Sequence, residues 1–279
     1  MELNYSVDMI RLRVNLSVEL VEEYIKIFSC EPSCLYYQKR DISSHRHNFK
    51  FEQYNSLGDK CSFWLGIQHN SLKPGNKSVD VVFEYNPNKC VGSDMLGYIL
   101  NSFYLNNPKV EVRKMDIAID IPVNILNIKF QKDRRDLTVK DKGSDNKTYY
   151  IGSRSSQGHI KIYNKKREGN LDYELTRYEI TIEPKMRIDS MVRIYSFDEN
   201  LLLPISCIDD VQLDFDLKGQ DRFNVLAVLD NPMLLSLLDK RKAKKIKDII
   251  SSIGSVCFDI GRINNTILNY LTNNIYTIC

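Results

Sequence analysis

Residues 148–167, TYYIGSRSSQGHIKIYNKKR, decide how the rest of the chain is arranged. Two runs rich in Thr, Tyr and Ile flank a polar Ser-Ser-Gln-Gly turn, a pattern that predicts a β-hairpin. In the second run, the alternation of a strand places the isoleucines on one face and Lys161 and Tyr163 on the other. Because Lys165 follows, Tyr163 has the surroundings of a nucleophile aimed at phosphate. A half-exposed strand tyrosine in a basic turn is the simpler interpretation of this stretch alone.

Acidic side chains are placed on strand faces before and after the hairpin. The segment KMDIAIDI, residues 114–121, predicts a strand with Asp116 and Asp120 on the face opposite its isoleucines. The strand predicted after the hairpin presents Glu179 in the same way, and an earlier predicted strand presents Glu84. Acids are unfavourable in strands, so three strands that each carry one predict a shared acidic surface.

These carboxylates predict a site for one divalent cation, Mg²⁺ or Mn²⁺, because hard cations prefer oxygen ligands. Asp116 and Asp120 lie roughly 13 Å apart along a regular strand, so one ion cannot bind both unless the strand bulges. Asp116 and Glu179 are therefore the predicted ligands, with Asp120 or Glu84 completing the site. The alternative is a solvent-facing sheet surface on which these acids form salt bridges, for example to Lys114 or Arg177.

Together, these features predict transesterification of a phosphodiester. A tyrosine phenolate attacks phosphorus, a carboxylate-bound cation polarises a non-bridging oxygen, and Lys or Arg offsets the developing charge. A free tyrosine has a pKa of about 10, so the phenol needs help from neighbouring charges at neutral pH. Lys161 and Lys165 are predicted to supply that help.

The overall charge is mild, but the basic residues are clustered. The 279-residue chain has a net charge of +3, yet residues 131–170 contain eleven Lys and Arg against five acids. A second cluster, KRKAKKIK at residues 240–247, places six positive charges in eight residues. Each cluster alone is typical of a solvated helix face, but two of them favour a polyanionic partner such as DNA.

The order of the predicted elements indicates an α+β protein. Up to about residue 183, strands and helices alternate, among them a helix at residues 18–28, a strand at residues 78–85 and a strand at residues 110–121 that a basic connection joins to the hairpin. Helical periodicity dominates afterwards, at residues 222–229, 232–252 and 260–275. The expected organisation is a domain with a largely antiparallel sheet flanked by helices, residues 1–184, followed by a mainly helical region, residues 185–279.

Composition predicts a soluble protein of a reducing cytoplasm. No run of eighteen or more apolar residues predicts a membrane span, and no secretory signal is visible. The seven cysteines are an odd number and are scattered, which favours buried free thiols over a zinc site.

Four sequence motifs occur in the order of a known family. They are VFEYNPNK at 82–89, MDIAID at 115–120, YIGSRSS at 150–156 with KIYNKK at 161–166, and TRYEI at 176–180. In this order they resemble the replication initiation factors of rolling-circle plasmids of the staphylococcal type, the Rep_trans family. That family is related to relaxases of integrative conjugative elements. The resemblance covers about residues 5–185, and the hairpin motif is its specific part.

The resemblance implies an activity and a set of residues. Members nick one DNA strand at a double-strand origin through the tyrosine of this hairpin motif, here Tyr163. The nick leaves a 5′-phosphotyrosyl link and a free 3′-hydroxyl that primes replication. The motif places Arg154, Lys161 and Lys165 around that tyrosine, and Lys161 replaces an arginine, which keeps the charge but loses the bidentate fork. Members use a divalent cation held by acidic side chains, which agrees with the predicted Mg²⁺ or Mn²⁺.

The resemblance also implies partners. Members often form homodimers, recruit a UvrD-like helicase and bind origin DNA through the C-terminal region, and they are cytoplasmic bacterial proteins encoded by plasmids or mobile elements, with no membrane partner. The predicted DNA-binding residues are Lys166, Arg167, Arg241, Lys242, Lys244 and Lys245. Two alternatives stay open: a conjugative relaxase that uses the same chemistry at a transfer origin, and a DNA-binding relative without catalysis.

Overall fold

The chain folds as two units that are interleaved in the sequence. Unit 1 consists of Met1–Asn4, Ile119–Ile180 and Asp198–Ile260, and unit 2 of Tyr5–Ala118, Thr181–Phe197 and Gly261–Cys279. The computed structural model describes residues 1–38, 45–54, 58, 60–68, 75, 77–106, 109–130, 134–208, 217, 219–230, 232–252 and 255–273. Antiparallel strands and helices make up the chain, which confirms the predicted α+β class. The division of function at residue 184 stays a prediction.

Unit 2 is built on a sheet with the strand order β2-β3-β4-β5-β1-β6, in which β1 to β5 pair antiparallel. Its strands are β1 (Asn4–Ser17), β2 (Cys34–Gln38), β3 (His45–Tyr54), β4 (Lys60–Gln68), β5 (Ser78–Tyr85), β6 (Glu111–Ile121) and β12 (Met186–Arg187). Its helices are α1 (Val18–Ser29), α2 (Asp94–Asn106), α4 (Ile188–Ile194) and α8 (Ile260–Leu271). The unit boundary falls within β6, so this strand contributes residues to both units.

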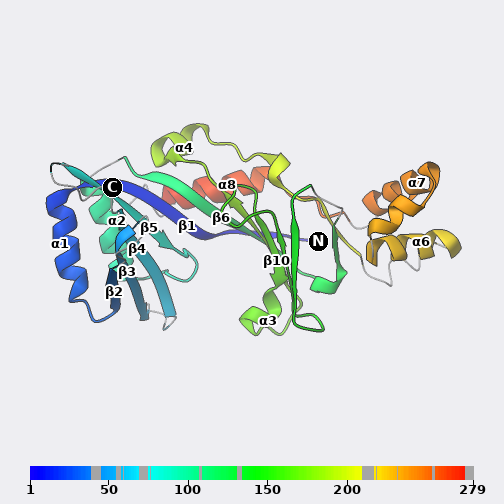
Figure 1. Cartoon of the computed structure of the whole chain (residues 1–279), viewed down its shortest axis with the longest axis horizontal. Coiled ribbons are helices and arrows are strands. Elements are labelled where there is room, and N and C mark those ends of the chain that lie inside the picture. The colour runs from blue at the N-terminus through cyan, green and yellow to red at the C-terminus, as the bar shows by residue number, and fades with distance from the viewer. Residues whose placement is uncertain are drawn as a thin grey trace. The chain divides into compact units, whose positions relative to one another are not determined.

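Helices α1 and α2 lie against this sheet (Figure 1), and aromatic side chains join them to it. Phe28 of α1 and Phe51 of β3 are both fully buried, and their rings meet edge-on with centroids 5.1 Å apart. Phe103 of α2 meets Phe83 of β5 in the same geometry at 5.7 Å. Offset and edge-on aromatic pairs contribute beyond their buried area, so these rings fix both helices on the sheet.

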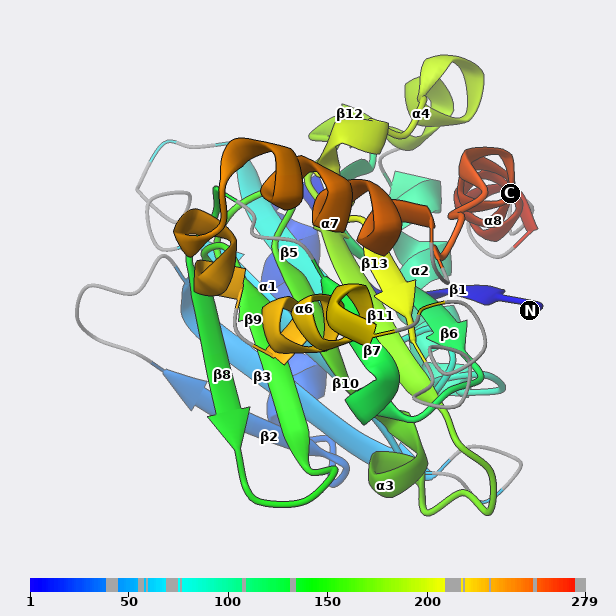
Figure 2. The ribbon, with the colours of Figure 1, turned by 90° about the vertical axis from the view of Figure 1, so that its right-hand side faces the viewer.

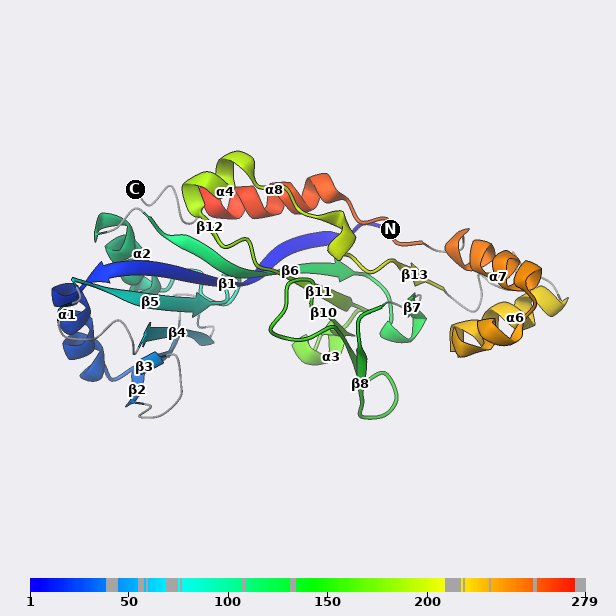
Figure 3. The ribbon, with the colours of Figure 1, turned by 45° about the horizontal axis from the view of Figure 1, so that its top comes forward.

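The last helix of unit 2 packs beside α4 (Figure 3). The Phe197 N–H, just after α4, donates to the Asn264 side-chain oxygen on α8 at 2.8 Å. Further along α8, the Tyr270 hydroxyl lies 2.8 Å from the Tyr85 hydroxyl of β5. These two hydrogen bonds therefore fix α8 within unit 2, one to the segment after α4 and the other to β5.

Unit 1 contains the hairpin that the sequence predicts. Its strands pair in the order β11-β10-β9-β8, and Figure 2 shows these four side by side. The elements are β7 (Ile128–Phe130), β8 (Leu137–Asp141), β9 (Lys147–Ile151), β10 (Ile160–Asn164), α3 (Lys165–Gly169), β11 (Thr176–Ile182) and β13 (Ile205–Cys207). Gly152 and Gly158, at the two ends of the β9–β10 connection, have φ of +80° and +77°, which only glycine adopts without strain. β7 and β13 form a separate two-stranded sheet.

Unit 1 also contains helices that follow β13 in the sequence: α6 (Gly219–Asp230), η4 (Pro232–Leu237) and α7 (Lys240–Ser252). The helical stretch predicted at residues 232–252 is divided into two helices. Asp239 begins a new helix, because its carboxylate accepts the Lys242 N–H at 2.9 Å, as a helix N-cap does. Val225 of α6 packs with Ile246 and Ile250 of α7 in a small apolar core of their own.

None of the helices in the described part of the chain has the length and apolar content that crossing a bilayer requires. The six described cysteines are free, and Cys61 and Cys90 are buried. The expectation of buried thiols is therefore wrong for Cys30 and Cys257, which are exposed, and Cys279 lies outside the described residues.

Buried phenols make the folded chain sensitive to strong alkali. Burial raises the pKa of Tyr24 to about 12, and it raises the pKa of Tyr85 and Tyr163 as well. The folded pKa values exceed the unfolded value of about 10, so this stabilisation is complete below about pH 10 and is lost as pH rises through the folded values. We expect the Tm, followed by circular dichroism, to fall steeply above about pH 10, and to fall less in Tyr24→Phe. Equal Tm values at about pH 8 and about pH 11 would contradict this.

Candidate active site

Four strands of unit 1 form one polar face. The antiparallel register sets Tyr163 opposite Arg177 and Thr148, and Lys161 opposite Glu179 and Tyr150. Directly opposed residues share a face, and so do residues two apart on one strand. The polar face of β8–β11 therefore carries Thr138, Lys140, Thr148, Tyr150, Lys161, Tyr163, Arg177 and Glu179. The opposite face carries the isoleucines of β10 that the sequence placed there.

Tyr163 is the centre of this face. Its side chain is 7% exposed, and its hydroxyl donates to Glu179 Oε1 at 2.7 Å. The Lys161 Nζ lies 3.7 Å from the centroid of the Tyr163 ring, and the Lys165 Nζ lies 6.0 Å from it. Lys161 also donates to Glu179 Oε2 at 3.2 Å. The structure thus brings together the predicted tyrosine, both predicted lysines and one predicted acid.

The charge state of Tyr163 differs from the expectation. Burial raises the pKa of its phenol, and the Glu179 carboxylate raises it further, while Arg177 has a smaller opposing effect. The prediction that neighbouring cations lower this pKa is wrong for this arrangement, because a carboxylate, Glu179, accepts a hydrogen bond from the phenol and stabilises its protonated form. The same hydrogen bond places Glu179 within reach of the phenol proton.

Asp120 forms a buried ion pair with the arginine opposite Tyr163. Arg177 donates to the two Asp120 carboxylate oxygens from Nε at 2.7 Å and from Nη2 at 2.8 Å. Both side chains are 11% exposed. Two parallel hydrogen bonds of this kind are the strongest form of an Arg–carboxylate pair. The salt-bridge alternative is therefore the one that the structure shows for Asp120.

Asp116 belongs to unit 2, where it accepts a hydrogen bond from the Thr181 hydroxyl at 2.6 Å. Burial raises the pKa of its carboxyl, and the nearby Asp8 and Glu84 act in the same direction. Glu84 in turn accepts from Arg11 Nε at 2.7 Å. A carboxyl whose charge is disfavoured by burial and by other acids is a place where a cation would be stabilising.

The carboxylates do not form a ready-made metal site. Among the described residues, no three His, Cys, Asp or Glu side chains lie close enough together to hold an ion. Both oxygens of Asp120 accept from Arg177, and both oxygens of Glu179 accept from Tyr163 and Lys161. These side chains are therefore engaged with protein donors and are not gathered around an ion, and the dependence on Mg²⁺ or Mn²⁺ stays a prediction.

The remaining predicted residues of the hairpin lie around this centre in different settings. The Arg154 guanidinium lies over the ring of Tyr150, with its Cζ 4.8 Å from the ring centroid. In α3, the Lys166 Nζ lies 2.5 Å from Glu174 and Arg167 Nη1 lies 3.0 Å from Asp145. These pairs are at the surface, where an ion pair contributes little to stability.

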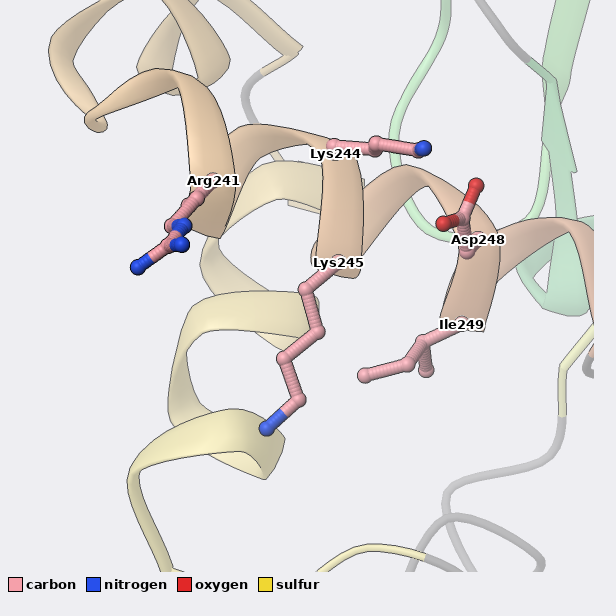
Figure 4. A pocket seen from close by; sticks show the side chains of 5 residues that line it. All are labelled: Arg241, Lys244, Lys245, Asp248 and Ile249. Atoms are coloured by element: carbon pink, nitrogen blue, oxygen red, sulfur yellow. The ribbon is translucent and has the colours of Figure 1, made fainter.

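The basic cluster of residues 240–247 forms the start of α7, and its side chains line a shallow pocket of about 550 Å³ (Figure 4). Lys245 extends toward α6, where its Nζ lies 2.7 Å from Asp221. Arg241 and Lys244 point in other directions from the same helix, and Lys242 lies 3.7 Å from Asp239. Helix α7 thus buries Ile246 in the apolar core, while Arg241, Lys244 and Lys245 are exposed to solvent.

Comparison with known proteins relates this chain to a solved structure but to no sequence family. No family model and no curated protein sequence matches this chain. Among solved structures, the chain is similar to a rolling circle replication initiator protein from Geobacillus stearothermophilus, with 16% identity and a TM-score of 0.36. The match covers 65% of this chain and 75% of the other. The function proposed below therefore depends on the motifs and on the geometry of the site.

Sequence reasoning missed two features of this face. Arg177 was not among the predicted site residues, although its buried pair with Asp120 lies opposite Tyr163. The stack of Tyr150 with His159, whose ring centroids are 6.1 Å apart, was also missed. The alternation of β9 and β10 put both rings on the polar face, but their contact depends on a register that the sequence does not state.

Proposed function

We propose that this protein is a nicking and closing enzyme that starts rolling-circle replication, with Tyr163 as its nucleophile. The proposal is carried by the surroundings of Tyr163. Its hydroxyl donates a hydrogen bond to Glu179 at 2.7 Å, and the Lys161 ammonium lies 3.7 Å from the centroid of its ring. A hydroxyl with a proton acceptor on one side and a cation beside it has what attack on a phosphodiester needs. The residue also occupies the tyrosine position of the hairpin motif that resembles the rolling-circle initiators.

The proposed reaction is a transesterification, in which the Tyr163 oxygen replaces the 3′ oxygen on one backbone phosphorus. The phenol oxygen of Tyr163 attacks a backbone phosphorus while its proton passes to the Glu179 carboxylate. The bond from phosphorus to the 3′ oxygen breaks, the 3′ oxygen takes up a proton from water, and the 5′ phosphate stays bonded to Tyr163. Lys161 offsets the charge that builds on the phosphate oxygens. Attack by a 3′-hydroxyl on the phosphotyrosyl bond reverses these steps and closes the strand.

The basic residues of α3 and α7 are proposed to hold the DNA. Lys166 and Arg167 follow the nucleophile strand directly, and Arg241, Lys242, Lys244 and Lys245 form a second cationic surface. Phosphate contacts of this kind give affinity without sequence preference and weaken with salt. A homodimer, a UvrD-like helicase and a cytoplasmic, plasmid-encoded setting belong to this proposal through the family resemblance.

The test is a covalent adduct. The protein is incubated with Mg²⁺ and supercoiled DNA of the element that encodes it, and the nicked strand is run on a denaturing gel. Protein attached to the 5′ end of the nicked strand is the expected result. Binding of the same DNA with no nick and no adduct would overturn the proposal in favour of a DNA-binding relative without catalysis. A conjugative relaxase would give the same adduct but at a transfer origin, so the mapped position of the nick separates the two.

Metal dependence is tested by removal and by substitution. We expect EDTA to stop nicking and Mn²⁺ or Mg²⁺ to restore it, and we expect Asp116→Ala and Glu179→Ala each to lower nicking by roughly a hundredfold or more. Both variants should keep salt-sensitive DNA binding, because the phosphate contacts come from other residues. Glu52→Ala, which removes a surface acid paired with Lys60, is the matched control. Equal loss of binding and nicking would show that Asp116 and Glu179 are structural instead.

A further inference from the structure

Tyr150 stands on the polar face beside the proposed nucleophile. It lies opposite Lys161 on one side and Thr138 on the other, and it is half-buried. Because Tyr163 lies opposite Thr148, Tyr150 is its diagonal neighbour across the β9–β10 pair. Diagonal neighbours in an antiparallel pair are about 7–8 Å apart. A nucleotide next to the phosphate at Tyr163 is within reach of this ring.

Two cations surround the Tyr150 ring. The Arg154 Cζ lies 4.8 Å from its centroid and the Lys140 Nζ lies 5.3 Å from it, both within the range of a cation–π contact. Both side chains are exposed. Lys140 comes from β8 and Arg154 from the β9–β10 connection, so two separate segments bring positive charge to one aromatic ring.

A fixed imidazole supports the ring from within the hairpin. The His159 ring stacks on Tyr150 with an interplanar angle of 15° and is 9% exposed. Its Nδ1 lies 3.1 Å from the Gly152 carbonyl oxygen, which sets the orientation of the ring. Tyr150 is therefore held in one position before any ligand arrives, and a preorganised ring loses less entropy on binding.

We propose that Tyr150 is a stacking site for a nucleobase of the cleaved strand, adjacent to the phosphate that Tyr163 attacks, with Lys140 and Arg154 binding the flanking phosphates. An aromatic ring among cations is the chemistry that binds single-stranded DNA, because every base has a face that can stack and every nucleotide carries a phosphate. A base can stack on a protein ring only when it is unpaired, so the site selects the single-stranded form of the nicking region. The inference rests on the proposed function in taking DNA as the ligand.

The test separates stacking from catalysis by using Tyr163→Phe protein throughout, which retains the platform without the nucleophile. A single-stranded thymidine oligonucleotide with one 2-aminopurine is titrated with this protein. We expect the fluorescence of the base analogue to be quenched, and we expect the added change Tyr150→Leu to remove the quenching and weaken binding roughly tenfold. Tyr150→Phe keeps a ring and should retain both. Tyr54→Leu, which removes an exposed tyrosine of unit 2, is the control.

A second measurement does not depend on how the variant folds. Protein with the native Tyr150 is irradiated on an oligonucleotide containing 5-iododeoxyuridine, and the cross-linked peptide is identified. The expected peptide contains Tyr150. Cross-linking elsewhere, or quenching and affinity that are unchanged in Tyr150→Leu, would overturn the proposal. If quenching depends on Tyr150 but the protein with native Tyr163 never nicks DNA, the stacking site is upheld and only the proposed function is contradicted.

Discussion

Replacing Tyr163 with phenylalanine abolishes the covalent protein–DNA adduct: this is the largest effect that we expect from any substitution in the chain. The change removes only the hydroxyl, which is the atom that would carry the phosphate. Glu179 keeps its hydrogen bond from Lys161, and the loss to stability is about 1.5–3 kcal/mol, the net value of one hydrogen bond to a charged group. Denaturing gels of protein incubated with supercoiled DNA and Mg²⁺ measure the adduct, and DNA binding measured in parallel should be retained.

The hairpin provides its own controls. Tyr149 lies opposite Ile162 on the apolar face, and Tyr150 lies diagonal to Tyr163 on the polar face. Tyr149→Phe and Tyr150→Phe should both form the adduct, because each keeps its ring and neither hydroxyl is the proposed nucleophile. An adduct that survives in Tyr163→Phe, or that is lost in one of the other two variants instead, would show that the nucleophile has been misassigned.

The buried pair of Arg177 and Asp120 should give the largest effect on stability. In Arg177→Met the Asp120 carboxylate stays buried without its two donors, and removing one partner of a buried pair costs about 3–5 kcal/mol. Urea denaturation measures the loss. Arg167→Met removes a surface pair with Asp145, in which the arginine is 56% exposed, and should cost less than about 1 kcal/mol.

A double variant distinguishes the loss of the ion pair from the loss of side-chain packing. In Asp120→Leu with Arg177→Met no charge is left buried, and replacing a buried pair by apolar residues is often neutral. We therefore expect the double variant to be more stable than Arg177→Met alone. Arg177→Met that is no less stable than Arg167→Met would contradict a stabilising ion pair. So would a double variant whose loss of stability equals the sum of the losses in Asp120→Leu and Arg177→Met.

Much of the fold was predictable because its strands and helices follow their periodicities closely. The strand predicted at residues 78–85 is β5, and the helix predicted at residues 18–28 ends one residue later, as α1. The segment at residues 137–141 was predicted as a basic connection but is β8, an edge strand whose five residues are all exposed. Burial on one face is what makes a strand visible in sequence, and β8 lacks it.

The site was predictable in its residues and not in its pairings. Alternation alone put Lys161 and Tyr163 on one face, and the structure confirms this. That Glu179 would accept from Tyr163, and that Asp120 would pair with Arg177, depends on how β11 is aligned with its neighbours. Register between strands that are distant in sequence is set by the whole sheet, so the sequence could offer Arg177 as one possible partner for these acids but could not assign it to Asp120.

The most direct measurement is the identity of the residue that carries the DNA. The adduct formed on supercoiled DNA is trimmed with nuclease and protease, and the peptide that retains a nucleotide is sequenced by mass spectrometry. The account predicts a phosphodiester link between the 5′ end of the nicked strand and the Tyr163 hydroxyl. A nucleotide on any other residue, or nicked DNA with no nucleotide on the protein, would contradict it.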